Sequence, residues 1–297
     1  MSHFINPFTD VGFKLIFGQE VSKDLLIDFL NDLLVSEKEI KDITFLDKEI
    51  LPEYMGDRGV IYDIYCTTAS GEHFIIEMQN RQQLHFRERA LFYLSRTIAH
   101  QGERGSGWNF DLKAVYGVFF MNFRLDDMPH KLRTDVILAD RDTHEQFNDK
   151  LRFIFIELPS FKKEEEECET DFERWIYILK NMETLKRMPF KARKSVFEKL
   201  EKIVDIASLS KEEREKYDES IKVYRDNLAV MAYAKEKERK EAERGRAEGL
   251  EKGRAEGRAE GTKQAQIDIA RKLKDRGCAV EEIADITGLT LNELKEI

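Results

Sequence analysis

The stretch YDIYCTTASGEHFIIEMQ, residues 62–79, decides the fold that we expect for this chain. Two runs rich in β-branched and aromatic residues, 60–66 and 73–78, lie on either side of the turn-forming segment TASGE. Such runs around a Ser-Gly turn are the usual sequence signal of a β-hairpin. The hairpin therefore gives two antiparallel strands from which the rest of the fold can be worked out.

Two carboxylates face each other in this hairpin. With the turn centred near Ser70, Asp63 lies opposite Glu77, and opposed side chains bring their Cβ atoms to about 5 Å. Gln79 projects from the same face as Glu77, because side chains alternate along a strand. Like charges this close destabilise a strand pair unless a cation lies between them, and magnesium takes oxygen ligands of this kind. The pattern predicts a metal site; the alternative is a hairpin whose polar residues only face solvent.

The neighbours of the two acids favour the metal site over that alternative. We expect Ile61, Tyr65 and Ile75 on the same face, so that Asp63 and Glu77 are partly removed from water. Acidic side chains embedded in apolar strands are unusual for a solvent-facing hairpin, because a buried charge needs a partner.

Composition excludes several classes of protein. The chain has 297 residues with 49 Lys and Arg against 58 Asp and Glu, a net charge of −9, which argues against a histone-like nucleic-acid binder. Its three cysteines lie far apart and predict neither a zinc site nor a disulfide framework. No apolar run approaches the roughly 18 residues of a membrane span, and no secretory signal begins the chain. Phosphate-loop and dinucleotide motifs are missing from the sequence as well. We therefore expect a cytoplasmic protein without a nucleotide cofactor.

Helices and strands alternate around the hairpin. Periodicity predicts a first helix around Phe13, Ile16 and Phe17, a second whose apolar face covers 25–34, and a third over 83–100. Strands are expected over 40–46, 112–123 and 153–158. Thr9 and Asp10 supply N-cap chemistry for the first helix, and Gly18 separates it from the second. Leu84, Leu91, Leu94 and Ile98 are expected on the apolar side of the third helix. This order predicts an α/β fold, a mixed sheet flanked by helices.

The second half of the chain is helical and highly charged. We expect a core over 1–160, a helical extension over 161–234, a charged arm over 235–262 and a small helical tail over 263–297. Glycine recurs every four residues in the arm, which is typical either of close helix–helix approach or of a loose spacer. The tail reads as two helices joined by a Thr-Gly turn, with Thr290 as an N-cap, and we interpret it as a packing or dimerisation element.

The order of four segments resembles the Rpn family of recombination-promoting nucleases and transposase-like proteins, in the PD-(D/E)XK superfamily. These segments are TDVGFKLIFG (9–18), DFLNDLL (28–34), the hairpin of residues 62–79, and RERALFYLSRTIAHQ (87–101). The resemblance covers about residues 4–230. It implies a restriction-endonuclease-like α/β core followed by a helical C-terminal region.

The resemblance also implies a catalytic site. Asp63 and Glu77 match the metal-binding acids of the motif, Gln79 stands at the position of the superfamily's lysine, and Asp10 matches the acid of the early helix. Magnesium or manganese would be the cofactor of a phosphodiester hydrolysis, with Gln79 positioning the attacking water. Two departures are Tyr62 in place of the motif's proline and Gln79 in place of lysine, which removes a positive charge. Asp10 has the alternative role of a plain helix N-cap.

Basic and aromatic residues near these acids are candidates for DNA contact. Lys14 lies one helical turn after Asp10 and could hold a phosphate or pair with that acid. Arg89, Tyr93 and Arg96 share one helix face and could grip the DNA backbone. The alternative is a solvated face whose arginines pair with acidic neighbours on the same helix.

These features predict a divalent-metal-dependent DNA endonuclease of low sequence specificity, acting in recombination or transposition. We expect a homo-oligomer, most simply a dimer, because cutting both strands commonly needs two sites. Two alternatives stay open: a catalytically weak DNA-binding accessory protein on the same fold, and a self-associating structural protein.

Overall fold

The computed structural model describes residues 3–50, 59–102, 108–125 and 129–297. The chain divides into two compact units, Met1–Arg225 and Asp226–Ile297. This division lies within one helix, and the finer boundaries that we expected at residues 160, 234 and 262 stay predictions.

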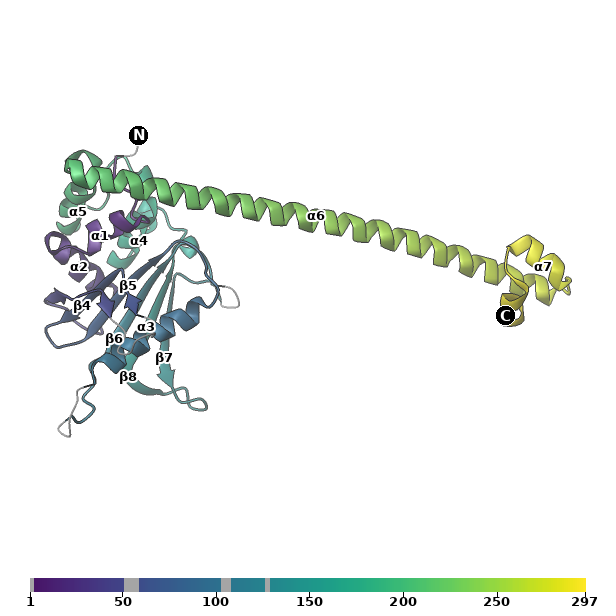
Figure 1. Ribbon diagram of the computed structural model, residues 1–297, viewed down its shortest axis with the longest axis horizontal. Coiled ribbons are helices and arrows are strands. Elements are labelled where there is room, and N and C mark those ends of the chain that lie inside the picture. The colour runs from purple at the N-terminus through teal and green to yellow at the C-terminus, as the bar shows by residue number, and fades with distance from the viewer. Residues whose placement is uncertain (1–2, 51–58, 103–107, 126–128) are drawn as a thin grey trace. The chain divides into compact units, whose positions relative to one another are not determined.

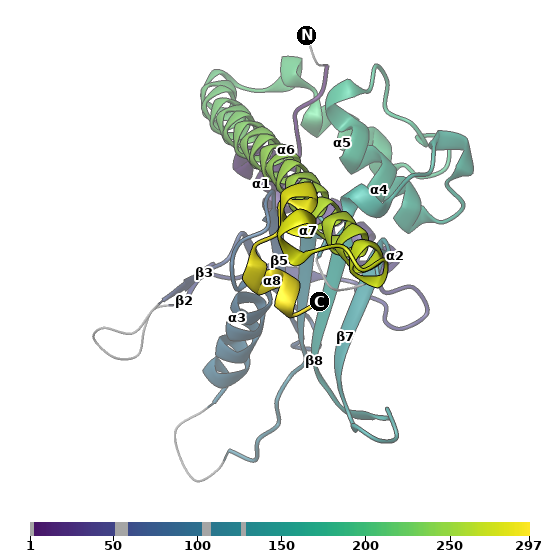
Figure 2. The same ribbon diagram turned by 90° about the vertical axis from the view of Figure 1, so that its right-hand side faces the viewer.

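A mixed six-stranded sheet forms the centre of the first unit (Figures 1 and 2). Its order is β1 (Ile43–Phe45), β4 (Ile64–Thr68), β5 (His73–Gln79), β6 (Val115–Met121), β8 (Gln146–Glu157) and β7 (Arg133–Ala139). Strands β5, β6 and β8 are parallel to one another, and the outer pairings are antiparallel. The α/β class predicted from the sequence is confirmed, although β7 was not among the predicted strands.

The hairpin has the predicted register, with Ile64 opposite Ile76 and Tyr65 opposite Ile75. The single strand expected over 60–66 is wrong, because the chain bends at Asp63. Residues Val60–Ile61 form β3, which pairs with β2 (Glu49–Ile50) in a separate two-stranded sheet. The bend changes which side chain faces inward. Ile61, expected beside the acids, is 60% exposed, whereas Tyr62 is buried in the cluster with Tyr65.

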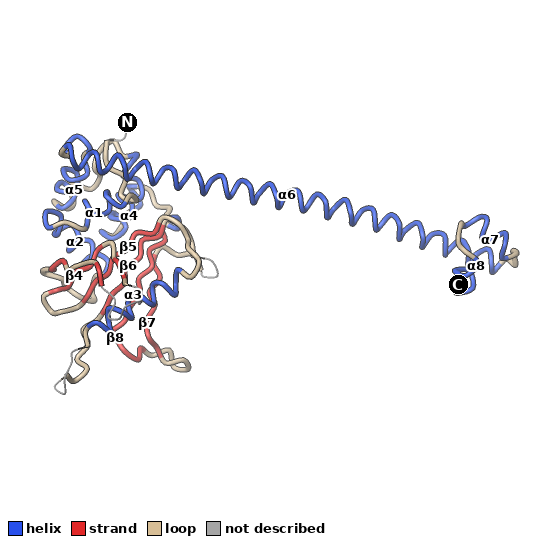
Figure 3. The backbone as a smooth tube through the Cα atoms, viewed as in Figure 1, coloured by secondary structure: helices blue, strands red, loops and turns tan. Residues whose placement is uncertain are grey.

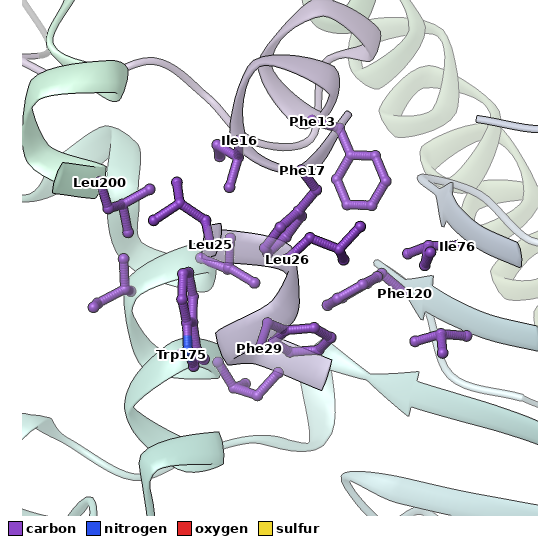
Figure 4. Close-up of a cluster of buried hydrophobic side chains, with 14 of the residues drawn as sticks. Phe13, Ile16, Phe17, Leu25, Leu26, Phe29, Ile76, Phe120, Trp175 and Leu200 are labelled. Carbon is purple, nitrogen blue, oxygen red and sulfur yellow. The ribbon is translucent and has the colours of Figure 1, made fainter. Parts of the chain in front are cut away.

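Four helices cover one face of the sheet. These are α1 (Asp10–Phe17), α2 (Lys23–Leu33), α4 (Asp171–Asn181) and α5 (Val196–Val204). Phe13 and Phe29 contact Phe120 of β6 with ring centroids 5.5 and 5.2 Å apart. Trp175 of α4 packs on Phe29 in the same cluster (Figure 4). This apolar layer fixes α1, and with it Asp10, against the sheet.

Local signals set the ends of α1 as predicted. Thr9 caps the helix, because its Oγ1 accepts a hydrogen bond from the Gly12 amide at 2.9 Å, and Gly18 follows the last turn. Short 3₁₀ helices connect the other elements of this unit. They span Glu20–Ser22, Leu158–Ser160, Glu165–Glu167, Met182–Thr184 and Ile206–Ser208.

Helix α3 (Phe86–His100) packs on the opposite face of the sheet. Its buried stripe is Phe86, Ala90, Leu94 and Thr97. The expected apolar side was therefore partly wrong, since Leu84 and Leu91 are exposed. The helix approaches the sheet closely at Gly117, where a Cβ atom would lie 2.6 Å from Leu94 Cδ1.

Helix α6 (Lys211–Asp275) is continuous, and it contains the end of the predicted helical extension and the whole of the charged arm predicted over 235–262 (Figure 3). In the second unit, α7 (Val280–Thr287) and α8 (Leu291–Lys295) pack on its last turns through Ala270, Ile283 and Leu294. Gly288 ends α7 in the left-handed conformation and Thr290 caps α8, as the Thr-Gly turn predicted.

The glycines of α6 give a prediction about its stability. A Cβ atom added at Gly249 or Gly257 would meet no atom within 4 Å. Each Gly→Ala change should therefore favour the helix by about 1 kcal/mol. We expect Gly249→Ala with Gly257→Ala to raise the midpoint of the thermal transition followed by circular dichroism at 222 nm, a wavelength at which helix dominates. Ala255→Gly, the matched reverse change, should lower it. A lower midpoint for the alanine variant would mean that the glycines contact another chain.

Candidate active site

Two acidic side chains meet where the hairpin bends. Glu77 projects from β5 and is 2% exposed, and Asp63 occupies the bend before β4. The Asp63 amide donates a hydrogen bond to Glu77 Oε1 at 3.1 Å. In return, the Met78 amide donates to Asp63 Oδ2 at 2.9 Å. Each carboxylate is thus held by the backbone of the opposite chain segment, which fixes both acids in one geometry.

Burial and mutual repulsion act on this pair. Burial raises the pKa of Asp63, and hydrogen bonding from the Met78 amide opposes that rise only in part. Burial, followed by the charge of Asp63, also raises the pKa of Glu77. Two neighbouring carboxyls that both have raised pKa values favour either a shared proton or a bound cation. When both carboxyls are ionised they repel each other, and a bound cation would offset this repulsion.

Gln79 lies beside Glu77 at the end of β5. Its side chain is buried, and Nε2 donates a hydrogen bond to Glu77 Oε2 at 3.2 Å. The side-chain amide of Gln79 therefore orients the Glu77 carboxylate and adds no charge to the site.

Helix α3 brings a positive charge to the same carboxylate. Arg89 Nη2 lies 3.6 Å from Glu77 Oε2, and Nη1 donates to Gln83 Oε1 at 2.6 Å. The guanidinium also lies over the ring of Tyr93, 5.2 Å from its centroid. Arg89 thus lies in the site itself, and the Tyr93 ring packs against its guanidinium.

Arg96 lies further along α3 and near Tyr62, whose pKa its charge lowers against the larger effect of burial. The Arg96 Nε is buried without a hydrogen-bond partner in the described part of the chain. Its guanidinium forms no ion pair within those residues. Arg96 is therefore a cation whose charge the described protein does not neutralise.

The N-terminus of α1 also reaches the site. Lys14 Nζ lies 2.5 Å from Asp10 Oδ1, so the pairing of these two residues is present. Lys14 lowers and Asp10 raises the pKa of Asp63 by charge interaction, after the larger effects of burial and the Met78 amide. The plain N-cap role for Asp10 is wrong, because Thr9 caps the helix and Asp10 is the first helical residue.

Asn80 joins these elements, a role that the sequence did not predict. Its Nδ2 donates a hydrogen bond to the Phe8 carbonyl at 2.6 Å, which ties the chain before α1 to the end of β5. Its Oδ1 is buried without a partner among the described residues. The one available signal was its position directly after Gln79, and the contact with Phe8 spans 72 residues, so no local pattern could show it.

Comparison with known proteins identifies the family of the chain. A family described as PD-(D/E)XK nuclease family transposase matches residues 7–234. The chain belongs to this family. The resemblance drawn from the sequence is therefore confirmed, and the mixed sheet flanked by helices is consistent with a PD-(D/E)XK fold. No curated protein and no solved structure matches the chain. Within the described ranges, no helix is long and apolar enough to cross a bilayer.

PD-(D/E)XK nucleases generally use divalent metals, and the residues at this site fit such an ion. The fit rests on the half-buried Asp63 and the buried Glu77, whose neighbouring carboxylates offer oxygen donors to a hard cation. No group of three or more potential His, Cys, Asp or Glu ligands occurs among the described residues. A site with two protein carboxylates suits magnesium, which usually keeps several waters and takes further oxygens from substrate phosphates.

Metal affinity should depend on pH because of the raised pKa values. A carboxyl with a raised pKa keeps its proton to higher pH, and a cation binds only the ionised form. We therefore expect manganese to bind more tightly at about pH 8.5 than at about pH 6, by roughly tenfold or more. Isothermal titration calorimetry measures the affinity at both values. Glu72→Gln is the control, since Glu72 pairs with Lys38 away from the site and should leave the pH dependence unchanged. Equal affinity at both pH values would contradict the raised pKa values.

Proposed function

We propose that this protein is a divalent-metal-dependent DNA endonuclease of low sequence specificity. The observation that carries the proposal is the interlocked pair of a half-buried Asp63 and a buried Glu77, each held by a backbone amide of the opposite segment. Membership of the PD-(D/E)XK nuclease family supports the reaction class. The natural setting would be recombination or transposition of DNA in the cytoplasm.

Magnesium or manganese, when bound, would polarise a phosphoryl oxygen and lower the pKa of a bound water. Asp63 and Glu77 supply the carboxylate oxygens for it, and the Met78 and Asp63 amides keep those oxygens in place. Gln79 orients Glu77 through its amide, and in this proposal it would also position the attacking water. Asp10 is the candidate for a further acidic ligand, reached through water.

Cations around the acids would balance the charge of the DNA. Arg89 lies within 3.6 Å of Glu77 and would offset negative charge that develops on the phosphate. Lys14 pairs with Asp10 and would bind a neighbouring phosphate. Arg96 would continue this surface along α3, and Tyr93 would contribute by holding the Arg89 guanidinium over its ring. None of these residues reads a base edge in an obvious way, and backbone contacts alone give affinity without sequence discrimination.

One departure favours a second candidate function, a catalytically weak DNA-binding accessory protein on the same fold. Gln79 stands where the superfamily has lysine, so the site lacks one positive charge for the phosphate. Arg89 supplies a charge nearby, which is the reason that we place the nuclease first.

Incubation of the purified protein with supercoiled plasmid tests the two functions against each other. With magnesium or manganese we expect conversion to nicked and linear DNA, and none with EDTA. Binding of the plasmid without any nicking in either metal would favour the accessory protein. Linear product that appears before nicked circles accumulate would support a dimer that cuts both strands together.

A further inference from the structure

One face of α3 carries an exposed aromatic ring between two arginines. Phe92 follows Arg89 by three residues and precedes Arg96 by four, so all three are neighbours on the helix surface. Phe92 is 43% exposed although it is a phenylalanine in a well-packed helix. We propose that this face binds unpaired bases of DNA, so that the substrate is DNA with a single-stranded segment or a junction beside the cleaved phosphate. The inference deepens the proposed endonuclease function and rests on it.

The face begins at the catalytic carboxylates. Arg89 lies 3.6 Å from Glu77, and Phe92 is one turn further along the same side of α3. Tyr93, the next residue, points toward the protein: its ring is 5.5 Å from that of Tyr62 and receives the Arg89 guanidinium at 5.2 Å. The inner aromatic therefore fixes Arg89, whereas the outer one, Phe92, is free to meet a ligand.

Charge at the site suits a single strand better than an intact duplex. Nonspecific duplex binding depends on the number of phosphates that cations neutralise, and the chain as a whole carries −9. Here two arginines flank the ring, and Glu88 on the same helix offsets part of their charge. Proteins that bind single strands combine a few cations with aromatic rings on which bases stack. In a duplex the faces of the bases are covered, so Phe92 could contact them only where pairing is broken.

An apolar protein partner would need a different surface. The other exposed large apolar side chain of α3 is Leu91, which is 51% exposed. Leu91 stands two positions after Arg89, a rotation of about 200° around the helix, so it lies on the other side from the guanidinium. The helix positions next to Phe92 hold Glu88, Arg89, Ser95 and Arg96, so polar and charged groups surround the ring and the two guanidinium groups complement phosphates.

Binding measured without metal tests the inference independently of cleavage. Fluorescence anisotropy in EDTA would follow a single strand of about 20 nucleotides, longer than common site sizes, and a blunt duplex of the same sequence. We expect Phe92→Ala to weaken single-strand binding about tenfold and duplex binding by less than about twofold. Phe92→Trp should preserve the single-strand affinity, because any aromatic ring can stack. Leu91→Ala is the matched control on the same helix and should bind both DNAs like the wild type.

Salt dependence separates stacking from charge. Phe92→Ala should leave the slope of log affinity against log salt unchanged, whereas Arg96→Ala should reduce it by roughly 0.7 for a single strand. Equal losses of single-strand and duplex binding in Phe92→Ala, or no loss in either, would overturn the inference. Phe92→Ala could instead change the molar mass measured by light scattering and leave DNA binding unchanged. That result would assign the face to a protein partner and would also overturn the inference.

Cleavage assays distinguish this inference from the proposed function. In magnesium, a duplex with a single-stranded branch should be cut faster than a blunt duplex, and Phe92→Ala should remove the preference. Plasmid nicking by a protein with no such preference would sustain the endonuclease and end the single-strand inference. If the protein cuts no DNA but Phe92→Ala selectively loses single-strand binding, the single-strand inference is sustained and the endonuclease proposal is overturned.

Discussion

Asp63→Asn and Glu77→Gln are each expected to abolish metal-dependent cleavage while leaving the protein at least as stable as the wild type. Loss of a carboxylate ligand removes the metal and its several kcal/mol of transition-state stabilisation, so cleavage should fall by about a thousandfold or more. The initial rate of plasmid nicking in magnesium measures the fall.

Stability should move in the opposite direction because the two acids repel each other. Burial and the partner charge raise the pKa of Glu77, so an uncharged amide in place of either carboxylate removes an unfavourable interaction. In Asp63→Asn the side-chain oxygen can still accept the hydrogen bond from the Met78 amide. We expect the melting temperature in EDTA to rise by roughly 2–4 °C, the change that about 1 kcal/mol produces in a domain of this size.

Asp111→Asn serves as the control for this pair of variants. Asp111 is an exposed carboxylate that pairs with Lys113, so its neutralisation should change neither cleavage nor stability appreciably. Inactive variants that melt well below the wild type would mean that the acids hold the fold together, and that the loss of cleavage says nothing about a metal. Variants that keep cutting would move the site elsewhere.

The pairing of Asp63 with Glu77 could be predicted because it depends on local information. A short turn fixes the register of a hairpin, and alternation along each strand then fixes which side chains share a face. The bend at Asp63 could not be predicted in this way. It arises because Val60–Ile61 pair with Glu49–Ile50, and this partner strand carries no strong signal in two residues.

The helix faces show the same limit. Periodicity predicted α3, yet Leu84 and Leu91 are as apolar as Phe86 and Leu94, so composition could not tell which residues would be buried. The sheet decides this, because the space above Gly117 accepts Leu94. The contact of Asn80 with Phe8 likewise joins distant segments. The acids of the site were visible in the sequence, whereas the residues that hold them together were not.

Gly12→Ala is expected to cause the largest loss of stability among single methyl additions in the first unit's helices. The residue is buried in α1, and a Cβ atom there would lie 2.2 Å from the Asn6 carbonyl oxygen and 2.7 Å from Thr9 Oγ1. The obstacle is a backbone atom that cannot rotate away, so the chain before the helix must move. Forcing atoms into a packed region costs about 3 kcal/mol at the upper end, and the melting temperature should fall by roughly 6–12 °C.

The same displacement should reach the active site. Asn6 and Thr9 are hydrogen-bonded to each other, and Phe8 between them accepts the bond from Asn80 that ties this segment to β5. Moving Asn6 therefore shifts Asp10 and the neighbouring lysine relative to Asp63, and plasmid nicking should slow even at temperatures where the variant is folded. Gly245→Ala gives the matched control, because a Cβ atom at Gly245 meets nothing within 4 Å and the change should stabilise its helix. If Gly12→Ala has the melting temperature and the nicking rate of the wild type, the segment before α1 does not pack against the helix at Gly12. The claim that this segment positions Asp10 would then be wrong.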